Sequence, residues 1–369
     1  MEKSKVYWSD LRTGWQNSLL DKLTRLMKAA GMESMDFDDK FVAVKMHFGE
    51  PGNLAFLRPN WAKCVCDEIK KLGGKPFLTD CNTLYVGGRK NALDHLETAY
   101  MNGFSPMSTG VQILIADGLR GNDETEVIVP GSKYIESAKI GKAVMDADIV
   151  VSLNHFKGHE GTGFGGALKN LGMGCGSRRG KMDMHSEGKP VVNRDLCIGC
   201  RRCAQICAHG APTFEGNKCR IDLTKCVGCG RCIAICPKDA ISAGAFHSNE
   251  LLNCRMMEYA KAVVQDRPTF HISIAVDISP NCDCHAENDL PIVPNVGMFA
   301  SFDPVALDQA CADAVNRMPQ NDCSMLGKAH QHTGDHFHDI HPDTSWKQGL
   351  AYAEEIGLGS REYELIKVE

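Results

Sequence analysis

Apolar and polar residues follow two alternating patterns along most of the chain. Over 17–30 the apolar side chains recur three and four positions apart, as on one face of a helix, and Gly31 marks its end. The same period predicts further helices over 60–72, 90–102, 133–146, 249–265 and 304–317. Short apolar runs between polar residues predict strands over 41–47, 75–80, 111–116, 126–129, 149–153 and 270–277. This alternation predicts an α/β protein whose mainly parallel sheet is covered by helices on both faces.

A cysteine-rich segment interrupts this alternation between residues 190 and 245. It holds two runs with the spacing C-x₂-C-x₂-C-x₃-C, formed by Cys197, Cys200, Cys203 and Cys207 and by Cys226, Cys229, Cys232 and Cys236. This spacing is typical of the bacterial ferredoxin-type domain, which binds two [4Fe–4S] clusters. We therefore expect a small inserted α+β ferredoxin-like domain over 190–245, between two parts of one α/β domain at 1–189 and 246–369.

The spacing also assigns a cluster to each cysteine. In ferredoxins of this pattern the fourth cysteine of each run ligates the other cluster, because a short helix leads it away from the first three. One cluster is then expected on Cys197, Cys200, Cys203 and Cys236, and the second on Cys226, Cys229, Cys232 and Cys207. Zinc is the competing interpretation, but a four-ligand zinc site has no use for the third cysteine of each run. Ala208 stands where the pattern expects proline after the fourth cysteine, and since proline is not a ligand the assignment is unaffected.

Composition and charge restrict the class of protein. The chain of 369 residues is 43% hydrophobic and 24% charged, which is typical of soluble globular proteins. A net charge of −5 argues against general nucleic-acid binding. The cysteine-rich segment is locally basic, with eight basic against four acidic residues, and this charge offsets that of thiolate-ligated clusters.

The chain shows no feature of a membrane or secreted protein. No apolar run reaches membrane-spanning length, and the first residues lack the apolar core of a secretory signal. We therefore expect a cytoplasmic protein that contacts no membrane. In that compartment the 18 cysteines indicate metal ligands or free thiols rather than disulfides.

Polar residues that can bind ligands follow four of the predicted strands. In chain order they are His47, then Asp80 and Asn82, then His155, Lys157 and His159, and finally Cys282 and Cys284. Ligands of open parallel sheets bind at the carboxyl ends of the strands. We expect these residues to share one site, in which His155 or His159 supplies protons and Lys157 holds an anionic group.

A glycine-rich segment follows Lys157 and His159. Gly161, Gly163 and Gly166 formally match G-x-G-x-x-G, but the first glycine lies well beyond the strand and the helix behind it is short. Both features argue against a nicotinamide-binding fold. Two interpretations stay open. One is an anion bound at the start of the helix at 167–171, and the other is a tight turn that lets the backbone approach the inserted domain.

Two further groups of residues have metal-ligand chemistry. Cys282, Cys284 and His285 can bind a metal ion, act as a redox dithiol or simply end a strand. Five histidines lie close together near the C-terminus, namely His330, His332, His336, His338 and His341. They can ligate a metal, but the glycine and aspartates between them favour a solvated surface loop.

Six short motifs are distributed over nearly the whole chain. They are VKMHFGE at 44–50, HFKGH at 155–159, GALKN at 166–170, CDC at 282–284, DPVALD at 303–308 and EIGLG at 355–359. Together they resemble the iron–sulfur branch of the domain-of-unknown-function 362 family. The resemblance implies an α/β domain that carries a ferredoxin-type insert, and it implies no reaction, because the family name records that none is assigned.

These patterns predict a cytoplasmic iron–sulfur oxidoreductase of unknown substrate. Two [4Fe–4S] clusters would relay electrons from a redox partner protein, such as a ferredoxin or flavoprotein, to a small anionic molecule at the strand ends. Cys282 and Cys284 would act there as a thiol pair or as ligands of an additional metal ion. The alternative is a non-catalytic electron carrier or an accessory factor that matures another metalloenzyme. A pure carrier has no need of a large α/β domain with polar strand ends.

Overall fold

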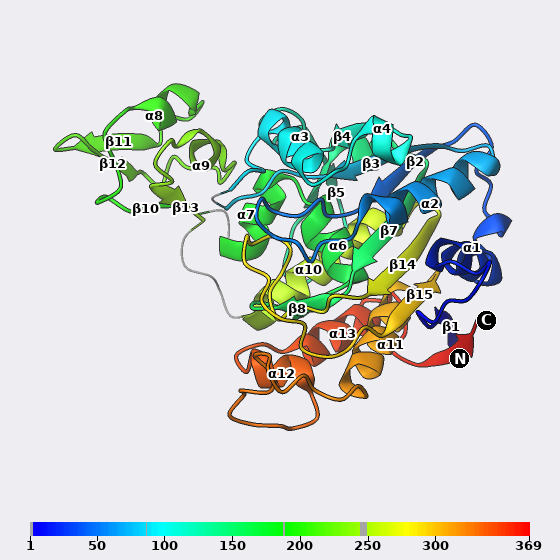
Figure 1. Ribbon diagram of the computed structural model, residues 1–369. Helices are drawn as coiled ribbons and strands as arrows, with labels where there is room; N and C mark the ends of the chain where they lie inside the picture. Colours follow the sequence, from blue (N-terminus) through cyan, green and yellow to red (C-terminus); the bar gives the residue numbers. More distant parts are fainter. Residues whose placement is uncertain (1–2, 86, 187–188, 244–248) are drawn as a thin grey trace.

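The computed structural model describes residues 3–85, 87–186, 189–243 and 249–369, and its centre is an eight-stranded sheet (Figure 1). In spatial order the strands are β16 (Tyr363–Lys367), β1 (Ser4–Ser9), β15 (Gly297–Ser301), β14 (Thr269–Ala275), β7 (Ile149–His155), β2 (Phe41–Lys45), β3 (Lys75–Asp80) and β4 (Ile113–Ile115). The five strands from β14 to β4 run parallel, whereas β15 pairs antiparallel with both β14 and β1. The predicted α/β class with a mainly parallel sheet is confirmed.

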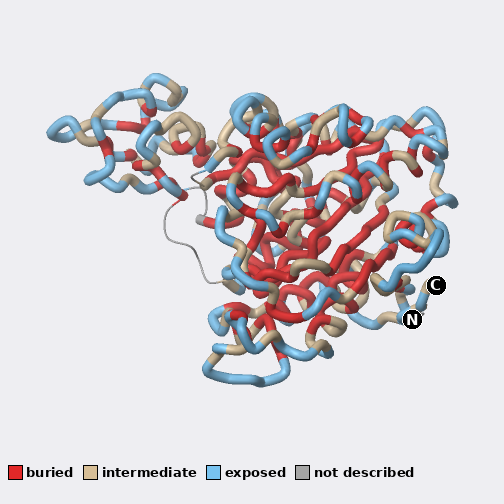
Figure 2. The backbone as a smooth tube through the Cα atoms, in the orientation of Figure 1, coloured by how far each residue is buried: buried red, intermediate tan, exposed pale blue. Residues whose placement is uncertain are grey.

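Helices cover both faces of this sheet. One layer contains α1 (Leu19–Ala29), α2 (Pro59–Lys71) and α3 (Ala92–Met101), and the other contains α6 (Ala167–Cys175), α10 (Asn249–Val264), α11 (Pro304–Asn316) and α13 (Trp346–Glu355). Successive strand residues face opposite layers: Val42 and Val44 pack in the first core, and Ala43 between them packs in the second. Figure 2 shows the central strands buried, as expected for parallel strands covered on both faces.

Local sequence explains where several helices begin. The side chain of Ser18 accepts the N–H of Asp21, and the Asp21 carboxylate accepts the N–H of Ser18 at 2.9 Å, which forms a capping box at the start of α1. Leu23 and Leu26 then lie on the buried stripe of the helix. Asp303 caps α11 in a similar way, because its carboxylate accepts the first free N–H groups of that helix.

The helix predicted over 133–146 is wrong in its first half. There β6 (Ala138–Gly141) pairs antiparallel with β5 (Glu124–Val127), and only α5 (Lys142–Asp146) is helical. Pairing with β5 and burial of Ala138 and Ile140 against α10 outweigh the helical period of this stretch. The smaller elements of the main body are η1 (Met32–Ser34), α4 (Pro106–Thr109), β8 (Lys157–His159), β9 (Gly163–Gly165), α7 (Arg178–Ser186) and α12 (His336–Ile340).

The cysteine-rich segment lies to one side of the main body, next to α3 and α7 (Figure 1). Its elements are β10 (Val191–Val192) paired with β13 (Ile241–Ser242), β11 (Pro212–Glu215) paired with β12 (Lys218–Ile221), and the helices α8 (Arg202–Ile206) and α9 (Arg231–Ile235). These elements share an apolar cluster that is separate from the two cores of the sheet. The division into units at 1–189, 190–245 and 246–369 stays a prediction, and its second boundary lies outside the described residues.

None of the helices in the described ranges combines the length and the apolar character needed to cross a membrane.

Candidate functional site

The carboxyl ends of four neighbouring strands open into one cavity. His47 follows β2, Asp80 ends β3, His155 ends β7, and Cys284 lies in the loop after β14; all four side chains line the cavity. Helices α6 and α7 close it from the side. The strand ends that the sequence pattern singles out thus lie at one cavity.

Five basic side chains line the cavity, namely Lys45, Lys157, Lys169, Lys181 and Arg89. Most of their charge is balanced: Lys45 Nζ lies 3.0 Å from Asp80 Oδ1, and Arg89 Nε lies 2.6 Å from Glu50 Oε2. Lys181 instead donates to the Gly176 carbonyl oxygen at 2.6 Å, and no carboxylate in the described ranges forms an ion pair with it. The cavity thus has a positive character that suits an anionic ligand.

His47 offers a neutral donor to this cavity. Its Nδ1 accepts the N–H of Gly49 at 2.9 Å, so the hydrogen of the neutral ring is on Nε2, which is buried and has no partner among the described residues. Burial, together with the nearby charge of Arg89, holds the pKa of His47 well below its usual value. The ring is therefore uncharged at neutral pH.

Asp80 and Asn82 differ in what they can contact. Burial opposes ionisation of Asp80, but the charge of Lys45 and the neighbouring His95, whose Nε2 lies 3.7 Å from Asp80 Oδ2, hold the pKa of its carboxyl well below the usual value. Asn82 lies outside the lining of the cavity and donates to the Asp117 carboxylate from its backbone N–H and its side chain, at 2.9 and 2.8 Å. Asn82 is therefore placed to hold the loop after β3 rather than a ligand.

His155 is fixed between two acceptors. Its Nδ1 lies 2.9 Å from both carboxylate oxygens of Asp283, and its Nε2 lies 2.7 Å from the carbonyl oxygen of Val276. Both ring nitrogens therefore already have partners within the protein. Burial opposes ionisation of Asp283, but the charges of His155 and Lys157 hold the pKa of this carboxyl far below the usual value. The geometry favours a positioning role for His155 over the predicted supply of protons.

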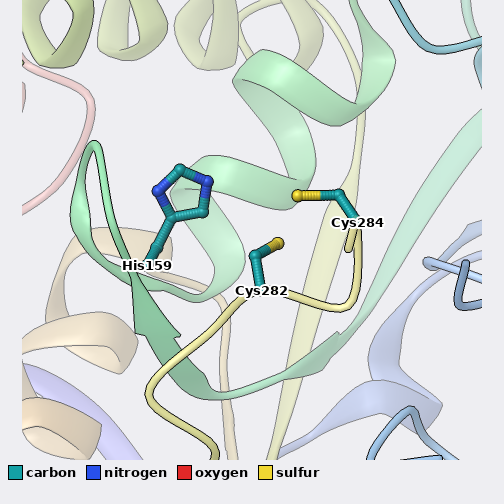
Figure 3. Close-up of side chains that lie close together, drawn as sticks. All are labelled: His159, Cys282 and Cys284. Carbon is teal, nitrogen blue, oxygen red and sulfur yellow. The ribbon is translucent and has the colours of Figure 1, made fainter. Parts of the chain in front are cut away.

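Cys282 and Cys284 stand in a turn in which the His285 N–H donates to the Cys282 carbonyl oxygen at 3.1 Å. With His159 they bring three potential ligand atoms within 4.8 Å of one another. Figure 3 shows both sulfurs and the imidazole converging on the same small space. Lys169 Nζ lies 3.3 Å from Cys282 Sγ. By composition and proximity, this group can hold a metal ion or act as a thiol pair.

A second group of three potential ligands shares Cys284 and adds Glu160 and His285. Glu160 Oε1 lies 2.6 Å from His285 Nε2. Burial opposes it, but the neighbouring His159 ring and the hydrogen bond from His285 lower the pKa of Glu160 to about 2, and the same hydrogen bond raises the pKa of His285. The two side chains therefore form an ion pair at the rim of the cavity.

The three glycines of the G-x-G-x-x-G match connect β8 to α6, and they are Gly161, Gly163 and Gly166. Gly163 takes a φ of +82°, which favours glycine. At the start of α6 the N–H groups of Ala167 and Leu168 donate to the Asp308 carboxylate at 2.7 and 2.9 Å. The predicted anion at this helix start is wrong, because a side chain of α11 already occupies it. The segment forms a tight turn, but its glycines lie against residues of α10, α11 and α13 and not against the inserted domain.

The five histidines between 330 and 341 do not gather at one point. His330 and His332 are exposed, His336 Nε2 lies 3.0 Å from the Met318 carbonyl oxygen, and His341 Nε2 lies 2.8 Å from that of Pro280. None of the five belongs to a group of three potential metal ligands within the described ranges. The surface-loop interpretation fits the first two, whereas His336 is buried at the start of α12.

In the cysteine-rich segment, Cys197, Cys200, Cys203 and Cys236 line one cavity. This set combines the first three cysteines of one run with the last cysteine of the other. A ninth cysteine of the segment, Cys219, lines the same cavity; its N–H donates to Cys197 Sγ at 3.3 Å, and its Sγ lies 3.6 Å from Cys203 Sγ. By its chemistry, this donor set fits a thiolate-ligated cluster.

The two cysteine runs repeat the same backbone. Gly199 and Gly228 occupy equivalent positions with φ of +68° and +73°, and Arg201 and Gly230 follow two residues later with φ of +62° and +66°. These left-handed residues fold each run into a tight loop that turns successive cysteines inward. The loops are closely packed, since a Cβ at Gly199 would lie 2.2 Å from the Asn217 carbonyl oxygen.

Arg178 lies between the second run and the main body. It is fully buried at the start of α7, and a Cβ at Gly230 would lie 2.8 Å from its Cγ. Burial lowers the pKa of Arg178, and the charges of Asp117, Cys229 and Cys232 oppose this shift. Asp117 also accepts hydrogen bonds from Asn82 in the loop after β3. Arg178 therefore lies between the second run and the part of the main body that holds the cavity at the strand ends, which we call the strand-end cavity.

Some residues that line the cavity do not directly follow a strand and are not identified from the sequence. They include Arg89, Lys169, Lys181 and His185. Lys169 and Lys181 belong to helices α6 and α7, which reach the cavity through tertiary packing. The sequence signals available for them are the GALKN motif at 166–170 and the basic residues at 178–181.

Comparison with known proteins assigns a family. The model of the family described as "Domain of unknown function (DUF362)" matches residues 42–313. A thylakoid-associated protein of Synechocystis sp. is 27% identical over 144 residues, which are 39% of this chain and 40% of that protein, so the match covers less than half of either. Among solved structures, the lactate racemase apoprotein of Thermoanaerobacterium thermosaccharolyticum aligns over 99% of this chain and 83% of its own, at a TM-score of 0.44 and 11% identity. A Thermotoga maritima protein aligns over 81% of this chain and 59% of its own, at a TM-score of 0.42 and 14% identity.

Proposed function

The chain belongs to the DUF362 family, and we propose that it is a redox protein that binds two [4Fe–4S] clusters. The first would be held by Cys197, Cys200, Cys203 and Cys236, and the second by Cys226, Cys229, Cys232 and Cys207. The observation that carries this proposal is the cavity lined by the first four thiols, because it brings the last cysteine of one run beside three cysteines of the other. Bound clusters would supply one-electron transfer.

The surroundings of Cys197 suit a thiolate ligand. Burial opposes its ionisation, but hydrogen bonds from the N–H groups of Cys219 and Gly199, together with the nearby charges of Lys218 and Arg194, lower the pKa of this thiol. Hydrogen bonds to cluster sulfurs and nearby cations also raise the reduction potential of a cluster. These residues would therefore both favour assembly and set the potential of the first centre.

We further propose that the chain is an oxidoreductase whose second site is the strand-end cavity. Lys181 has no carboxylate partner in the described ranges, and His47 presents a neutral N–H donor, so the cavity suits a small anionic molecule. A redox partner protein, a ferredoxin or flavoprotein, would contact the cysteine-rich segment, which stands at one end of the molecule (Figure 1). The proposal includes a cytoplasmic location and no binding of nucleic acid or membrane.

One observation favours a different function. His159, Cys282 and Cys284 have the composition of a metal site, and an accessory factor that matures a metalloenzyme would use such a group to pass on an ion. A non-catalytic electron carrier is the other alternative. It has no need of the polar, ligand-capable residues at the strand ends, which argue against it.

Metal analysis of protein purified without oxygen separates these functions. The proposal predicts about eight irons and eight sulfides per chain and no further ion. A ninth, exchangeable ion that disappears in a Cys282→Ala/Cys284→Ala variant would favour the maturation factor. The matched control is Cys323→Ala, at an exposed cysteine outside both sites, which is expected to keep the full iron content. Protein that holds zinc in place of iron would contradict the proposal.

A further inference from the structure

The turn that carries Cys282 and Cys284 is held firmly in the core. The carboxylate of Asp283, between the two cysteines, accepts a hydrogen bond from His155 at 2.9 Å and lies 3.5 Å from Lys157 Nζ. Cys282 is fully buried, whereas Cys284 lines the strand-end cavity. The turn therefore presents one sulfur to the cavity and keeps the other directly behind it.

The hydrogen bonds of His159 decide between a metal site and a thiol pair. Its Nδ1 accepts the backbone N–H groups of Gly161 and Thr162 at 2.9 and 3.1 Å, and a backbone N–H can only donate. The ring hydrogen is therefore on Nε2, the nitrogen that faces the sulfurs in Figure 3. A histidine that ligates a metal through Nε2 needs the opposite tautomer, in which Nδ1–H donates to an acceptor. His159 is thus arranged as a hydrogen-bond donor to sulfur.

The sulfur of Cys282 lies among three groups that can donate a hydrogen bond. The ammonium group of Lys169 is 3.3 Å away, and the His159 ring and Cys284 Sγ lie within 4.8 Å. The hydrogen bond from Cys284 and the charge of Lys169 hold the pKa of Cys282 well below its usual value against the effect of burial, and the hydrogen bond to Cys282 raises the pKa of Cys284. The two thiols therefore differ in acidity, an arrangement typical of reactive dithiols.

We propose that Cys282 and Cys284 are a redox-active dithiol that reduces a small, anionic disulfide bound in the strand-end cavity. The anionic character follows from the basic residues of the cavity, above all Lys181. The position of Cys284 at the cavity surface makes it the attacking sulfur, and the buried Cys282 completes the reaction from behind.

The reaction with a disulfide R–S–S–R proceeds in two thiol–disulfide exchange steps. The proton of Cys284 passes to Cys282 along their hydrogen bond, and the Cys284 thiolate attacks one substrate sulfur. A Cys284–S–S–R bond forms, the substrate S–S bond breaks, and the first RS⁻ takes the proton from Cys282. The Cys282 thiolate then attacks Cys284 Sγ, the protein disulfide forms, and the second RS⁻ leaves and takes a proton from solvent. Two electrons move from the protein sulfurs to the substrate, which becomes two RSH.

The inference rests on the proposed function only for the electrons that would restore the dithiol after each turnover. A single turnover of reduced protein needs neither cluster, and an added dithiol reagent can replace the natural reductant. Failure of the dithiol proposal is therefore distinguishable from failure of the cluster proposal.

The test is a single turnover with 3,3′-dithiodipropionate, followed by peptide mass analysis. Fully reduced protein, freed of reductant under argon, is expected to lose two hydrogens in the peptide that contains Cys282 and Cys284. In Cys282→Ser the reaction stops halfway, so a mixed disulfide is expected to accumulate on Cys284. In Cys284→Ser the adduct on Cys282 is expected to form at least about tenfold more slowly, because that sulfur is buried. The Cys323→Ser control is expected to react as the unaltered chain does.

A second experiment varies the charge of the disulfide substrate. Cystamine has the same disulfide with cationic ends, and we expect it to react at least about tenfold more slowly than the dicarboxylate. Lys181→Met is expected to reduce this difference by slowing the reaction with the dicarboxylate alone.

Several results would overturn the proposal. These are a peptide at 282–284 that stays reduced while other thiols react, equal adduct formation in both serine variants, or equal rates for the two substrates. A metal ion that copurifies with the chain and is lost in Cys282→Ser/Cys284→Ser would also reject it. If Cys282→Ser does not fold, the intramolecular disulfide in the unaltered chain decides the question.

Discussion

Asp308 is predicted to make the stability of the protein fall as the pH rises towards neutrality. Its carboxyl is fully buried, and burial raises its pKa from 3.8 to about 7, although the N–H groups of Leu168 and Ala167 partly oppose the shift. Below about pH 3 the carboxyl is protonated in both the folded and the unfolded chain. Between pH 4 and 7 the folded chain keeps the proton and the unfolded chain releases it, so unfolding becomes progressively easier. The stabilisation is thus complete at low pH and is lost as the pH rises through about 7.

The magnitude follows from the size of the shift. A difference of about three pKa units corresponds to about 4 kcal/mol in total, since each unit is worth about 1.4 kcal/mol. Between pH 5.5 and 7.5, where the comparison is practical, the expected loss is about 2 kcal/mol. Asp308→Asn removes the titration and keeps one acceptor oxygen for the start of α6. The free energy of unfolding of the unaltered chain, minus that of the variant, is therefore expected to fall by about 2 kcal/mol over this range.

Urea unfolding of both proteins without oxygen, followed by tryptophan fluorescence, measures this difference. Subtracting the variant cancels the other titrating groups that the two chains share. A difference that stays constant between pH 5.5 and 7.5, or that grows with pH, would show that Asp308 is ionised in the folded protein. The inference that burial keeps this carboxyl protonated in the folded chain at pH 5.5 would then be incorrect.

Two further predictions concern the cysteine-rich segment. If the runs exchange their last ligands, the double variant Cys197→Ser/Cys236→Ser damages one cluster and is expected to keep about four irons per chain, whereas Cys226→Ser/Cys236→Ser damages both and is expected to keep almost none; iron analysis giving the reverse pattern would reject the exchange. Gly199→Ala is expected to destabilise the segment by about 1–3 kcal/mol and to lower its iron content, because the residue has φ of +68° and its Cβ would lie 2.2 Å from a carbonyl oxygen. Gly216→Ala shares the positive φ of +56° but meets nothing within 4 Å, so an equal loss of iron in both variants would remove the role of close packing.

The sequence predicts the parts of the site that depend on local pattern and on sheet geometry. Apolar runs and their order predict a parallel sheet, and the carboxyl ends of parallel strands meet at one edge. This is why His47, Asp80, His155 and Cys284 can be placed at one cavity before the structure is known. Their individual roles do not follow in the same way, because they depend on which partner each side chain meets.

Two features show what the pattern of residue types leaves open. In the sequence, the start of α6 resembles an anion site. In the structure, the side chain of Asp308 from α11 occupies it, and no pattern near α6 indicates a side chain from a helix so distant in the sequence. The tautomer of His159 is also set by its contacts, namely two backbone N–H groups in the turn after β8. The composition of the Cys282–Cys284 group therefore suggests a metal site as readily as a dithiol, and the hydrogen bonds separate the two.

Electron paramagnetic resonance of dithionite-reduced protein, purified without oxygen, is the most direct test of the central claim. Two [4Fe–4S] centres that exchange ligands lie close together, so we expect about two spins per chain and the broadening of magnetically interacting centres, with about eight irons in the same sample. A colourless protein with no such signal, or one that contains zinc in place of iron, would contradict the claim.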